Sequence, residues 1–325
     1  MSAVTISIII ATRNRETILW TTVEKAITAI KGLPAEIIVV NDGDQPLQIP
    51  GASKGLITCF TSPSKGVSAA RNYGAAKAGG TIYFFVDDDM WINREAVQWV
   101  INQMKADGNS NFVYNLNWQY PGTLNEKLKT TKVGKYILSA QYNTMWGRMH
   151  AEGTKPANGL YRFQHIASCS LVMHKNIFDA LKGYNESLIF QGEDIDLSAR
   201  LNKNAIPIFC VFDVLMHHNH ADRLDLDGYL QREINGFRCQ FTAEKAGLIT
   251  TPGKQYKRAG LLFFDLFAAS EKTWLAIYKM IPSHQFFVPL TNKFTGLLTG
   301  LQRYKQWRNI IGKQPSATLK SRPFK

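Results

Sequence analysis

An apolar run that ends in three consecutive carboxylates constrains this chain more than any other feature. Residues 84–86 read Phe-Phe-Val, which is typical of a buried strand, and Asp87, Asp88 and Asp89 follow at once. Burying an unpaired carboxylate is costly, so these acids are expected to face a cation or water. Hard oxygen ligands suit Mg²⁺ or Mn²⁺, and such ions commonly bridge carboxylates to phosphates. The run therefore predicts a metal-assisted diphosphate site, although an acidic turn after a strand explains it equally well.

Continuous apolar segments alternate with helical patterns through the first third of the chain. Strands are predicted at 6–10, 36–40 and 56–60 as well as at 84–86, and an Ala-rich helix at 66–78. This alternation predicts an α/β fold with a parallel sheet covered on both faces. The polar loops follow the strands, so they gather at one edge of the sheet, where such folds bind ligands. No G-x-G-x-x-G or phosphate-loop sequence is present, which disfavours a dinucleotide dehydrogenase or an ATPase.

Five short motifs, in this order, resemble those of family 2 glycosyltransferases with the GT-A fold. They are SIIIATRNR at 7–15, VVNDG at 39–43, KGVSAARNYG at 65–74, VDDD at 86–89, and GYNE at 183–186 followed by GEDIDL at 192–197. Each motif alone is weak, but five in one order are a strong signal. The resemblance covers roughly residues 1–220 and implies an enzyme that uses a nucleotide-sugar donor. One departure is Asn41, where many members carry an acid.

The resemblance implies that the donor contacts residues of the first four motifs. These residues are Thr12, Arg13, Asn14, Asp42, Lys65, Arg71, Asp87 and Asp88. Asp42 can accept a hydrogen bond from a pyrimidine imide N–H, which favours a UDP-sugar. Arg71 can pair with phosphate through its planar guanidinium, and Lys65 is a weaker phosphate candidate. Ordinary explanations also exist, such as a helix cap for Thr12 or a solvated turn for Asp42.

For the metal, the resemblance assigns direct coordination to Asp89, with Asp87 beside it and facing the ribose or the sugar. Spacing alone does not choose among the three acids. His217, His218 and His220 follow another apolar segment, and some GT-A enzymes add a histidine from this region to the metal site. His217 or His218 is the preferred ligand, although a surface histidine cluster is the simpler interpretation. The expected ion is Mn²⁺ or Mg²⁺.

The last motif contains the expected catalytic base. Glu193 and Asp194 open a helical segment, and acids in a first helical turn are favoured by the helix dipole in any case. The resemblance instead indicates that Asp194 takes the proton of the acceptor hydroxyl and that Glu193 positions the acceptor. A divalent ion would stabilise the charge of the departing diphosphate. One base that assists a single displacement implies an inverting, metal-dependent glycosyltransferase.

A division of the chain is expected near residue 224. Residues 1–224 are predicted to form the catalytic domain, with a nucleotide-binding half up to about residue 110 and an acceptor half from residue 111. Residues 225–325 are predicted to form a helical, basic, amphipathic region. Within the acceptor half, residues 121–160 contain Gly, Pro and Lys and are predicted to form a mobile loop that holds the acceptor. That acceptor is expected to be a glycan or a lipid-linked sugar, as in polysaccharide biosynthesis.

Positive charge is concentrated in the last quarter of the chain. Residues 251–325 contain 13 Lys and Arg but only two acids, Asp265 and Glu271, in a chain of formal net charge +13. Phe, Trp and Leu are interleaved with them, and no stretch is apolar enough to span a bilayer. This pattern predicts helices that lie on an anionic membrane, although a helical subdomain with a solvated basic face would also fit. Nucleic-acid binding competes as an explanation, but no recognition motif is present, so no nucleic acid is expected as a partner.

The cysteines and the start of the chain favour a cytoplasmic protein, peripheral on the inner face of a membrane. Cys59, Cys169 and Cys210 lie in apolar runs without a C-x-x-C pair and are expected to be buried, reduced thiols. No signal segment precedes the first strand. A sugar nucleotidyltransferase is the alternative enzyme, but residues 11–15 contain no glycine-rich loop. A non-catalytic nucleotide-sugar-binding protein is disfavoured by the intact acids.

Overall fold

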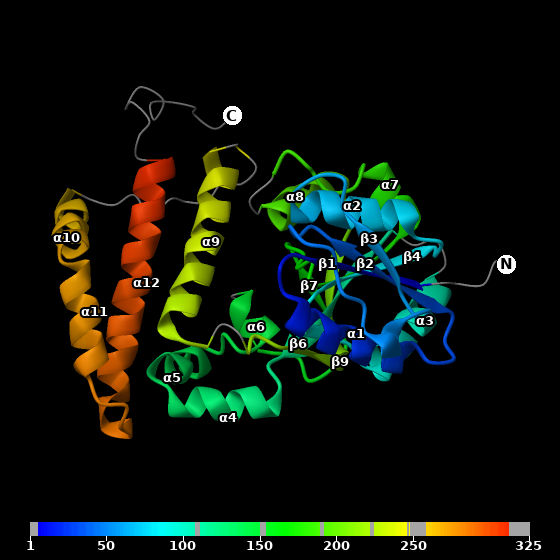
Figure 1. The fold of residues 1–325 in the computed structure, drawn as a ribbon. Helices are drawn as coiled ribbons and strands as arrows, with labels where there is room; N and C mark the ends of the chain where they lie inside the picture. Colours follow the sequence, from blue (N-terminus) through cyan, green and yellow to red (C-terminus); the bar gives the residue numbers. More distant parts are fainter. Residues whose placement is uncertain are drawn as a thin grey trace. The chain divides into compact units, whose positions relative to one another are not determined.

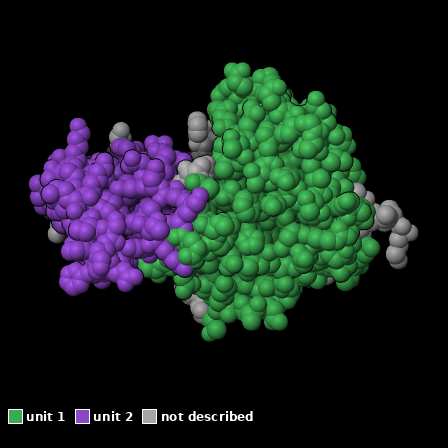
Figure 2. Space-filling model, turned by 60° about the horizontal axis from the view of Figure 1, so that its bottom comes forward, with its two compact units in different colours: residues 1–126, 138–221 green, residues 127–137, 222–325 purple. Residues whose placement is uncertain are grey.

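The chain folds into two compact units (Figure 2). The computed structural model describes residues 6–107, 111–149, 154–188, 192–221, 224–245, 247 and 258–311. Unit 1 comprises residues 1–126 and 138–221, and unit 2 comprises residues 127–137 and 222–325. The short stretch 127–137 therefore belongs to unit 2, although it interrupts unit 1 in the sequence.

A nine-stranded mixed sheet forms the core of unit 1. Its strands have the order β3-β2-β1-β4-β8-β6-β9-β5, and β7 pairs with β9. The bounds are β1 Ile6–Thr12, β2 Ala35–Asn41, β3 Thr58–Thr61, β4 Ile82–Asp87, β5 Met90–Trp91, β6 Val113–Gln119, β7 Leu160–Phe163, β8 Ser170–His174 and β9 Ile208–His218. The first four strands are parallel, as predicted, whereas β8 pairs antiparallel with β4 and β6. The ends of β1, β2 and β4 therefore share one edge of the sheet, where ligands bind in such folds.

Helices cover both faces of this sheet (Figure 1). One face carries α1 Glu16–Ile30 and α3 Arg94–Asp107, and the other carries α2 Val67–Lys77, α7 Lys175–Ala180 and α8 Glu193–Lys203. Ile9 and Phe85 are buried in a cluster with Ile177 of α7 and Leu197 of α8. Ile8 is equally buried, and its side chain alternates to the opposite face of the sheet. The continuous apolar strands are thus explained by burial on both faces, and the predicted α/β fold is confirmed.

The prediction of a mobile loop at 121–160 was wrong, because most of this segment is regular. It contains α4 Gly122–Thr130, α5 Lys132–Ser139, α6 Met145–Arg148 and β7, while residues 150–153 lie outside the described part. Pro121 precedes α4 and its carbonyl accepts the N–H of Leu124 at 2.9 Å. Thr144 caps α6 by accepting the N–H of Gly147 at 3.2 Å. Pro121 and Thr144 therefore stand at the starts of helices, and composition alone did not distinguish such residues from residues of a loop.

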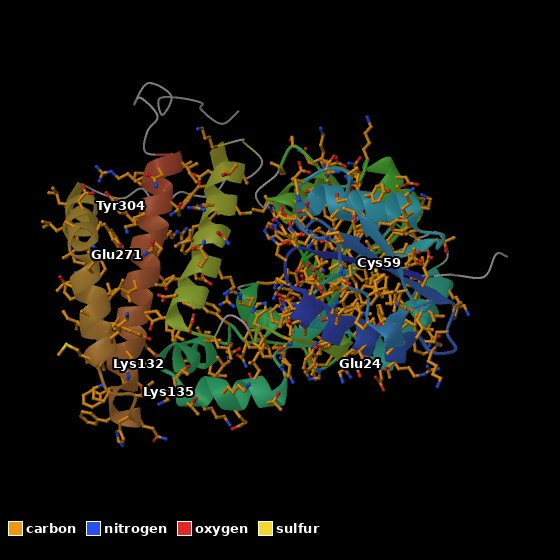
Figure 3. All side chains as sticks on the ribbon, in the orientation of Figure 1. Glu24, Cys59, Lys132, Lys135, Glu271 and Tyr304 are labelled. Atoms are coloured by element: carbon orange, nitrogen blue, oxygen red, sulfur yellow. The ribbon has the colours of Figure 1, made fainter. Side chains whose placement is uncertain are left out.

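The cysteines are free thiols, as predicted, but they are not equally buried. Cys210 in β9 is buried, whereas Cys59 and Cys169 are half-buried. Cys59 lies on β3 (Figure 3), whose burial pattern is only partial. The expected burial is therefore confirmed for Cys210 alone among these three residues.

Unit 2 is a helical region around α12. The bounds are α9 Leu226–Lys245, α10 Arg258–Ala269, α11 Glu271–Met280, η2 Gln285–Phe287 and α12 Val288–Ile310, and η1 Gly51–Ser53 completes the elements of unit 1. Helix α12 lies between α9 on one side and α10 with α11 on the other (Figure 1). Tyr278, Leu298 and Tyr304 are buried in this region. Within the described ranges, no helix is both long and apolar enough to cross a membrane.

Two lysines tie the start of α5 to the other helices of unit 2. Lys132 Nζ donates to the carbonyl oxygens of Tyr278 at 2.7 Å and Lys279 at 3.0 Å, near the end of α11. Lys135 Nζ donates to the carbonyl oxygen of Ser283 at 2.5 Å (Figure 3). Lysines commonly satisfy the last carbonyls of a helix in this way. These bonds explain why residues 127–137 belong to unit 2.

Gly74 allows α2 to approach the sheet closely, so Gly74→Ala should destabilise unit 1. An added Cβ would lie 2.6 Å from Ile9 Cγ2 and 3.1 Å from Val40 Cγ2. The expected loss is about 1–3 kcal/mol, the usual cost of overpacking, and urea denaturation followed by circular dichroism measures it. Gly122→Ala is the control, because its Cβ would meet nothing within 4 Å. Equal unfolding midpoints for the two variants would contradict the close approach.

Candidate active site

Two of the three carboxylates at the end of β4 are buried and share one arginine. Arg15, just before α1, donates to Asp88 and, at 2.9 Å, to Asp89. Thr12 Oγ1 donates a further hydrogen bond of 2.7 Å to Asp88. Burial and the charge of Asp89 nevertheless raise the pKa of Asp88 above its usual range. Arg15 belongs to the first motif, but no local pattern distinguishes its role from that of Arg13.

Asp89 also forms a buried group with His218 and His220 that could hold a metal ion. One ligand atom from each of the three side chains lies within 4.8 Å of the other two. His218 Nε2 is 2.9 Å from Asp89 Oδ1, and His220 Nε2 is 3.7 Å from Asp89 Oδ2. Although burial opposes ionisation, both histidines and Arg15 hold the pKa of Asp89 well below its usual range. One carboxylate with two imidazoles is a donor set that fits a first-row divalent ion.

Neighbouring strands fix the positions of these ligands. Strand β5 pairs antiparallel with β9, so that Met90 lies opposite His218. The N–H of Asn219 donates to the carbonyl oxygen of Asp89 at 2.7 Å. Tyr120 places its hydroxyl 2.7 Å from Nδ1 of His220. Outer hydrogen bonds of this kind orient metal-binding histidines, so the group is built as a supported site.

Of the two histidines preferred from the sequence, the structure brings His218 to Asp89 and leaves His217 outside the group. His217 is half-buried, pairs in register with Trp91, and alternates to the other face of β9. Strand β9 itself includes His217 and His218, which were expected to follow the apolar segment. His220, two residues beyond His218, joins the group instead. The i, i+2 spacing of His218 and His220 was the sequence signal for this pair.

Arg71 joins the donor-side acids to the acceptor-side motif. It is 4 % exposed on α2 and donates to Asp87 at 2.7 Å and to Glu193 at 3.1 Å. Its guanidinium also lies over the ring of Tyr184, 5.3 Å from the ring centroid. The Arg71 guanidinium was expected to bind a phosphate, but in the structure it pairs with the carboxylates of Asp87 and Glu193. These contacts favour a bridging role for Arg71.

Asp194 lies at the start of α8 in a partly buried, hydrogen-bonded site. The backbone N–H of Ser168 donates to both carboxylate oxygens, at 3.2 and 3.3 Å, and the Ser168 hydroxyl donates to one of them. Ser168 Oγ is also 2.9 Å from the hydroxyl of Tyr184. Burial and the charge of Glu193 raise the pKa of Asp194 to about 7, against the opposing effects of Arg71 and Ser168. A carboxylate that titrates near neutral pH is suited to general-base catalysis.

The loops after β1 and β2 meet around Asp42. This carboxylate is buried and accepts the N–H of Gly66 with both oxygens at 3.0 Å. Arg13 Nη1 lies 3.8 Å from it. Lys65 Nζ donates to the carbonyl oxygen of Asp42 at 3.1 Å and to the side chain of Asp44 at 3.2 Å. Lys65 thus holds the loop together, which weakens its candidacy as a phosphate ligand.

Two asparagines stabilise these loops. Asn14, with φ of +55°, donates to Asp44 Oδ2 at 3.0 Å and accepts the N–H of the same residue at 3.1 Å. Asn41 is buried, donates to the carbonyl oxygen of Gln45 at 2.7 Å, and accepts the N–H of Gly43 at 2.8 Å. Asn41, the departure from the family pattern, therefore has a structural role in its own turn.

Three residues that the sequence did not single out complete these networks: Arg15, Ser168 and Tyr184. His220 was among the three histidines considered but was not the preferred ligand. Arg15 and Tyr184 stand within the motifs, so their motif positions were the signal available for them. Ser168 lies outside every motif and reaches Asp194 only through the fold. No local pattern marks such a contact.

The mixed sheet, its acids at the carboxyl edge and the Asp194 site define a GT-A-like glycosyltransferase. A family model described as glycosyl transferase family 2 matches residues 7–179, which is more than half of the chain. The chain therefore belongs to glycosyltransferase family 2. This confirms the family and the class of enzyme that the five motifs predict. No curated protein sequence matches the chain.

Solved structures resemble the chain at low sequence identity, and the one with a TM-score above 0.5 shares its fold. The mannosyltransferase PcManGT from Pyrobaculum calidifontis, in complex with GDP-Man and Mn²⁺, is 13 % identical with a TM-score of 0.54, over 95 % of this chain and 88 % of that one. GalNAc-T7, with UDP, GalNAc and Mn²⁺, is 14 % identical with a TM-score of 0.48, over 96 % of this chain and 57 % of that one. TarS from S. aureus is 12 % identical with a TM-score of 0.47, over 94 % and 55 %. The chain thus spans little more than half the length of the last two proteins.

Asp89→Ala should abolish the Mn²⁺-dependent part of nucleoside diphosphate binding, because it removes the only carboxylate of the described metal group. Isothermal titration calorimetry with UDP and with GDP, each with and without Mn²⁺, measures this. Asp179→Ala is the matched control, since Asp179 is exposed and pairs with Lys175 at 2.9 Å. Circular dichroism checks that both variants fold. An unchanged Mn²⁺ dependence in folded Asp89→Ala would remove Asp89 from the metal site.

Proposed function

We propose that the chain is an inverting, metal-dependent glycosyltransferase that moves a sugar from a UDP-sugar to a hydroxyl of a glycan or lipid-linked acceptor. The observation that carries this proposal is the bridge from Asp87 through Arg71 to Glu193, which joins donor-side and acceptor-side motifs within unit 1. Membership of family 2 supports it further. The same membership disfavours a sugar nucleotidyltransferase and a non-catalytic binding protein.

The donor nucleotide would lie against the loops after β1 and β2. A carboxylate has about four lone-pair sites, so Asp42 can accept a pyrimidine imide N–H in addition to the N–H of Gly66. Thr12, Arg13 and Asn14 of the first motif would lie near the same nucleotide, and an imide N–H that donates to Asp42 would favour uracil as the base. Lys65 would act by keeping this loop in shape.

Asp89, His218 and His220 would hold the divalent ion beside the donor diphosphate. Imidazole ligands favour Mn²⁺ over Mg²⁺, and the Mn²⁺ in the PcManGT complex agrees with this choice. When bound, the ion stabilises the negative charge that develops on the departing diphosphate. Asp87 is more exposed than its two neighbours and is available to the ribose or the sugar. Asp88 would act by holding Arg15 in place.

Asp194 would take the proton from the acceptor hydroxyl. Its raised pKa gives the carboxylate enough basicity to remove a proton as the bond to the sugar forms. Glu193, fixed by Arg71, would orient the acceptor at the same helix end. One base on the acceptor side predicts a single displacement and hence inversion at the anomeric carbon.

Unit 2 would hold the enzyme against the cytoplasmic, anionic face of a membrane, where a lipid-linked acceptor of polysaccharide biosynthesis lies. The described helices α10 to α12 contain seven Lys and Arg but only Asp265 and Glu271 as acids. Such a basic surface is attracted to anionic lipids. Nucleic acid remains the competing partner by charge alone, but the exposed apolar side chains of these helices favour lipid.

Asp194→Asn should bind the donor almost normally but transfer sugar at least about a hundredfold more slowly, since it lacks the proton acceptor. Single-turnover transfer and donor binding by calorimetry separate the two effects. Proton NMR of the wild-type product should show inverted anomeric configuration. Near-normal transfer by the variant would assign the base elsewhere, and retention of configuration would refute the single displacement.

Ser168→Ala should raise the pKa of Asp194, because it removes a hydrogen bond to the charged carboxylate. The base must be ionised, so activity rises with pH through this pKa, and the acid limb of the kcat/KM profile should move to higher pH. Arg71 and Glu193 face the same carboxylate and stay unchanged, whereas Tyr184 loses its contact with the Ser168 hydroxyl. Ser168→Thr keeps a hydroxyl and should restore the wild-type limb. Identical limbs in the wild type and the Ala variant would contradict this role.

A further inference from the structure

Exposed apolar side chains are concentrated in unit 2. Eight of the ten large apolar side chains that are exposed in the described residues lie on α10, α11, η2 and the first half of α12: Leu262, Phe263, Leu266, Ile277, Met280, Phe286, Leu290 and Leu297. The other two, Leu56 and Leu160, belong to unit 1. Single exposed apolar residues are ordinary, whereas such a concentration marks an interaction surface. These eight residues are called the apolar surface of unit 2.

On α11, the apolar surface runs beside a row of lysines. Thr273, Ile277 and Met280 follow the i, i+4, i+7 spacing of one exposed helix face, and Met280 is 81 % exposed. Lys272 and Lys279, also exposed and seven residues apart, form the adjacent row. Lysine stems can lie along apolar surface while their ammonium groups reach polar surroundings. The pattern therefore suits a boundary between an apolar layer and a charged one.

The same pattern continues from η2 into α12. Phe286 is 80 % exposed, and Leu290 and Leu297 follow it at i+4 and i+11, which places all three on one stripe. Lys293, exposed and at i+7, stands within that stripe. Elements η2 and α12 are adjacent in the chain, and both follow α11 within unit 2.

The acids of these helices are engaged with α12. Asp265 pairs with Arg308, and Glu271 pairs with Lys305. Glu271 lies at the start of α11 (Figure 3) and Asp265 in α10. Since these are the only acids between residues 258 and 311, Lys293 and the two lysines of α11 leave the apolar surface positively charged.

We propose that the apolar surface of unit 2 inserts into the headgroup region of an anionic bilayer, with Lys272, Lys279 and Lys293 contacting the acidic lipids. This inference specifies which residues of unit 2 would contact the membrane. It depends on the proposed function only for the lipid-linked acceptor. Charge complementarity selects lipid over a second copy of this chain, because two such surfaces repel each other. No described helix could span a bilayer, so the binding is interfacial.

Flotation of the full chain with vesicles tests the surface. One variant replaces three apolar residues (Ile277→Gln, Met280→Gln, Phe286→Gln), a second replaces three lysines (Lys272→Gln, Lys279→Gln, Lys293→Gln), and the control carries Leu56→Gln and Leu160→Gln. Vesicles of phosphatidylcholine alone are compared with vesicles that also contain phosphatidylglycerol. All sites are exposed, so the variants should fold, and circular dichroism checks this.

The wild type and the control should bind anionic vesicles equally and neutral vesicles more weakly. The apolar variant should lose at least about tenfold in partitioning on anionic vesicles, as expected for three exposed apolar groups. The lysine variant should lose about fivefold per charge at low salt, and little on neutral vesicles.

Three outcomes would overturn the proposal. They are equal flotation of the apolar variant and the wild type, no binding of the wild type to anionic vesicles at low salt, and a dimer that only the apolar variant disrupts while flotation persists. Mn²⁺-dependent UDP binding, measured without vesicles, reports on the donor site separately. If the wild type binds vesicles but shows no Mn²⁺-dependent UDP binding, the proposed function is refuted, while the proposed membrane-binding surface is not.

Discussion

Burial of negative charge at the end of β4 is the constraint on which the site depends. Three successive carboxylates repel one another and are costly in a low-dielectric environment unless each has its own compensation. Arg71 pairs with Asp87, and Arg15 pairs with both Asp88 and Asp89. His218 and His220 also contact the Asp89 carboxylate. These partners come from α2, from the loop before α1 and from the far side of the sheet. The acids can therefore be buried only when those elements have packed together.

The arrangement also couples parts of the site that are distant in the sequence. Asp87 and Glu193 lie 16 and 122 residues from Arg71, yet both accept hydrogen bonds from its guanidinium. Tyr184 lies under the same guanidinium and contacts Ser168, which in turn holds the catalytic candidate Asp194. In a buried network of this kind, a change of charge at one carboxylate alters the electrostatic environment of the others. A donor bound beside Asp87, as proposed above, would therefore change the electrostatic environment of the acceptor-side acids.

The sequence predicted what depends on local patterns and missed what depends on contacts between elements. Apolar strands and polar strand ends predicted the parallel half of the sheet and the edge that carries Asp42 and Asp89. His220 was not chosen, because its place depends on the pairing of β9, whose register with β6 shifts between Leu116 and Asn117. Ser168 has no motif at all. The helices within 121–160 were missed because Pro, Thr and Lys serve equally in loops and at helix ends.

Acids in both units pair with cations of the same unit. In unit 1, Arg15 and Arg71 pair with the buried acids. In unit 2, Asp265 and Glu271 pair with Arg308 and Lys305 of α12, while the lysines of α11 face solvent. This excess of positive charge lies outside the site residues of unit 1. Electrostatic attraction by these lysines acts over about 10 Å and weakens as the salt concentration rises. The hydrophobic contribution of residues such as Met280 requires direct contact and is not weakened by salt. A bilayer, the partner proposed above, would use both, because its headgroups carry the charge and its acyl boundary accepts the apolar side chains.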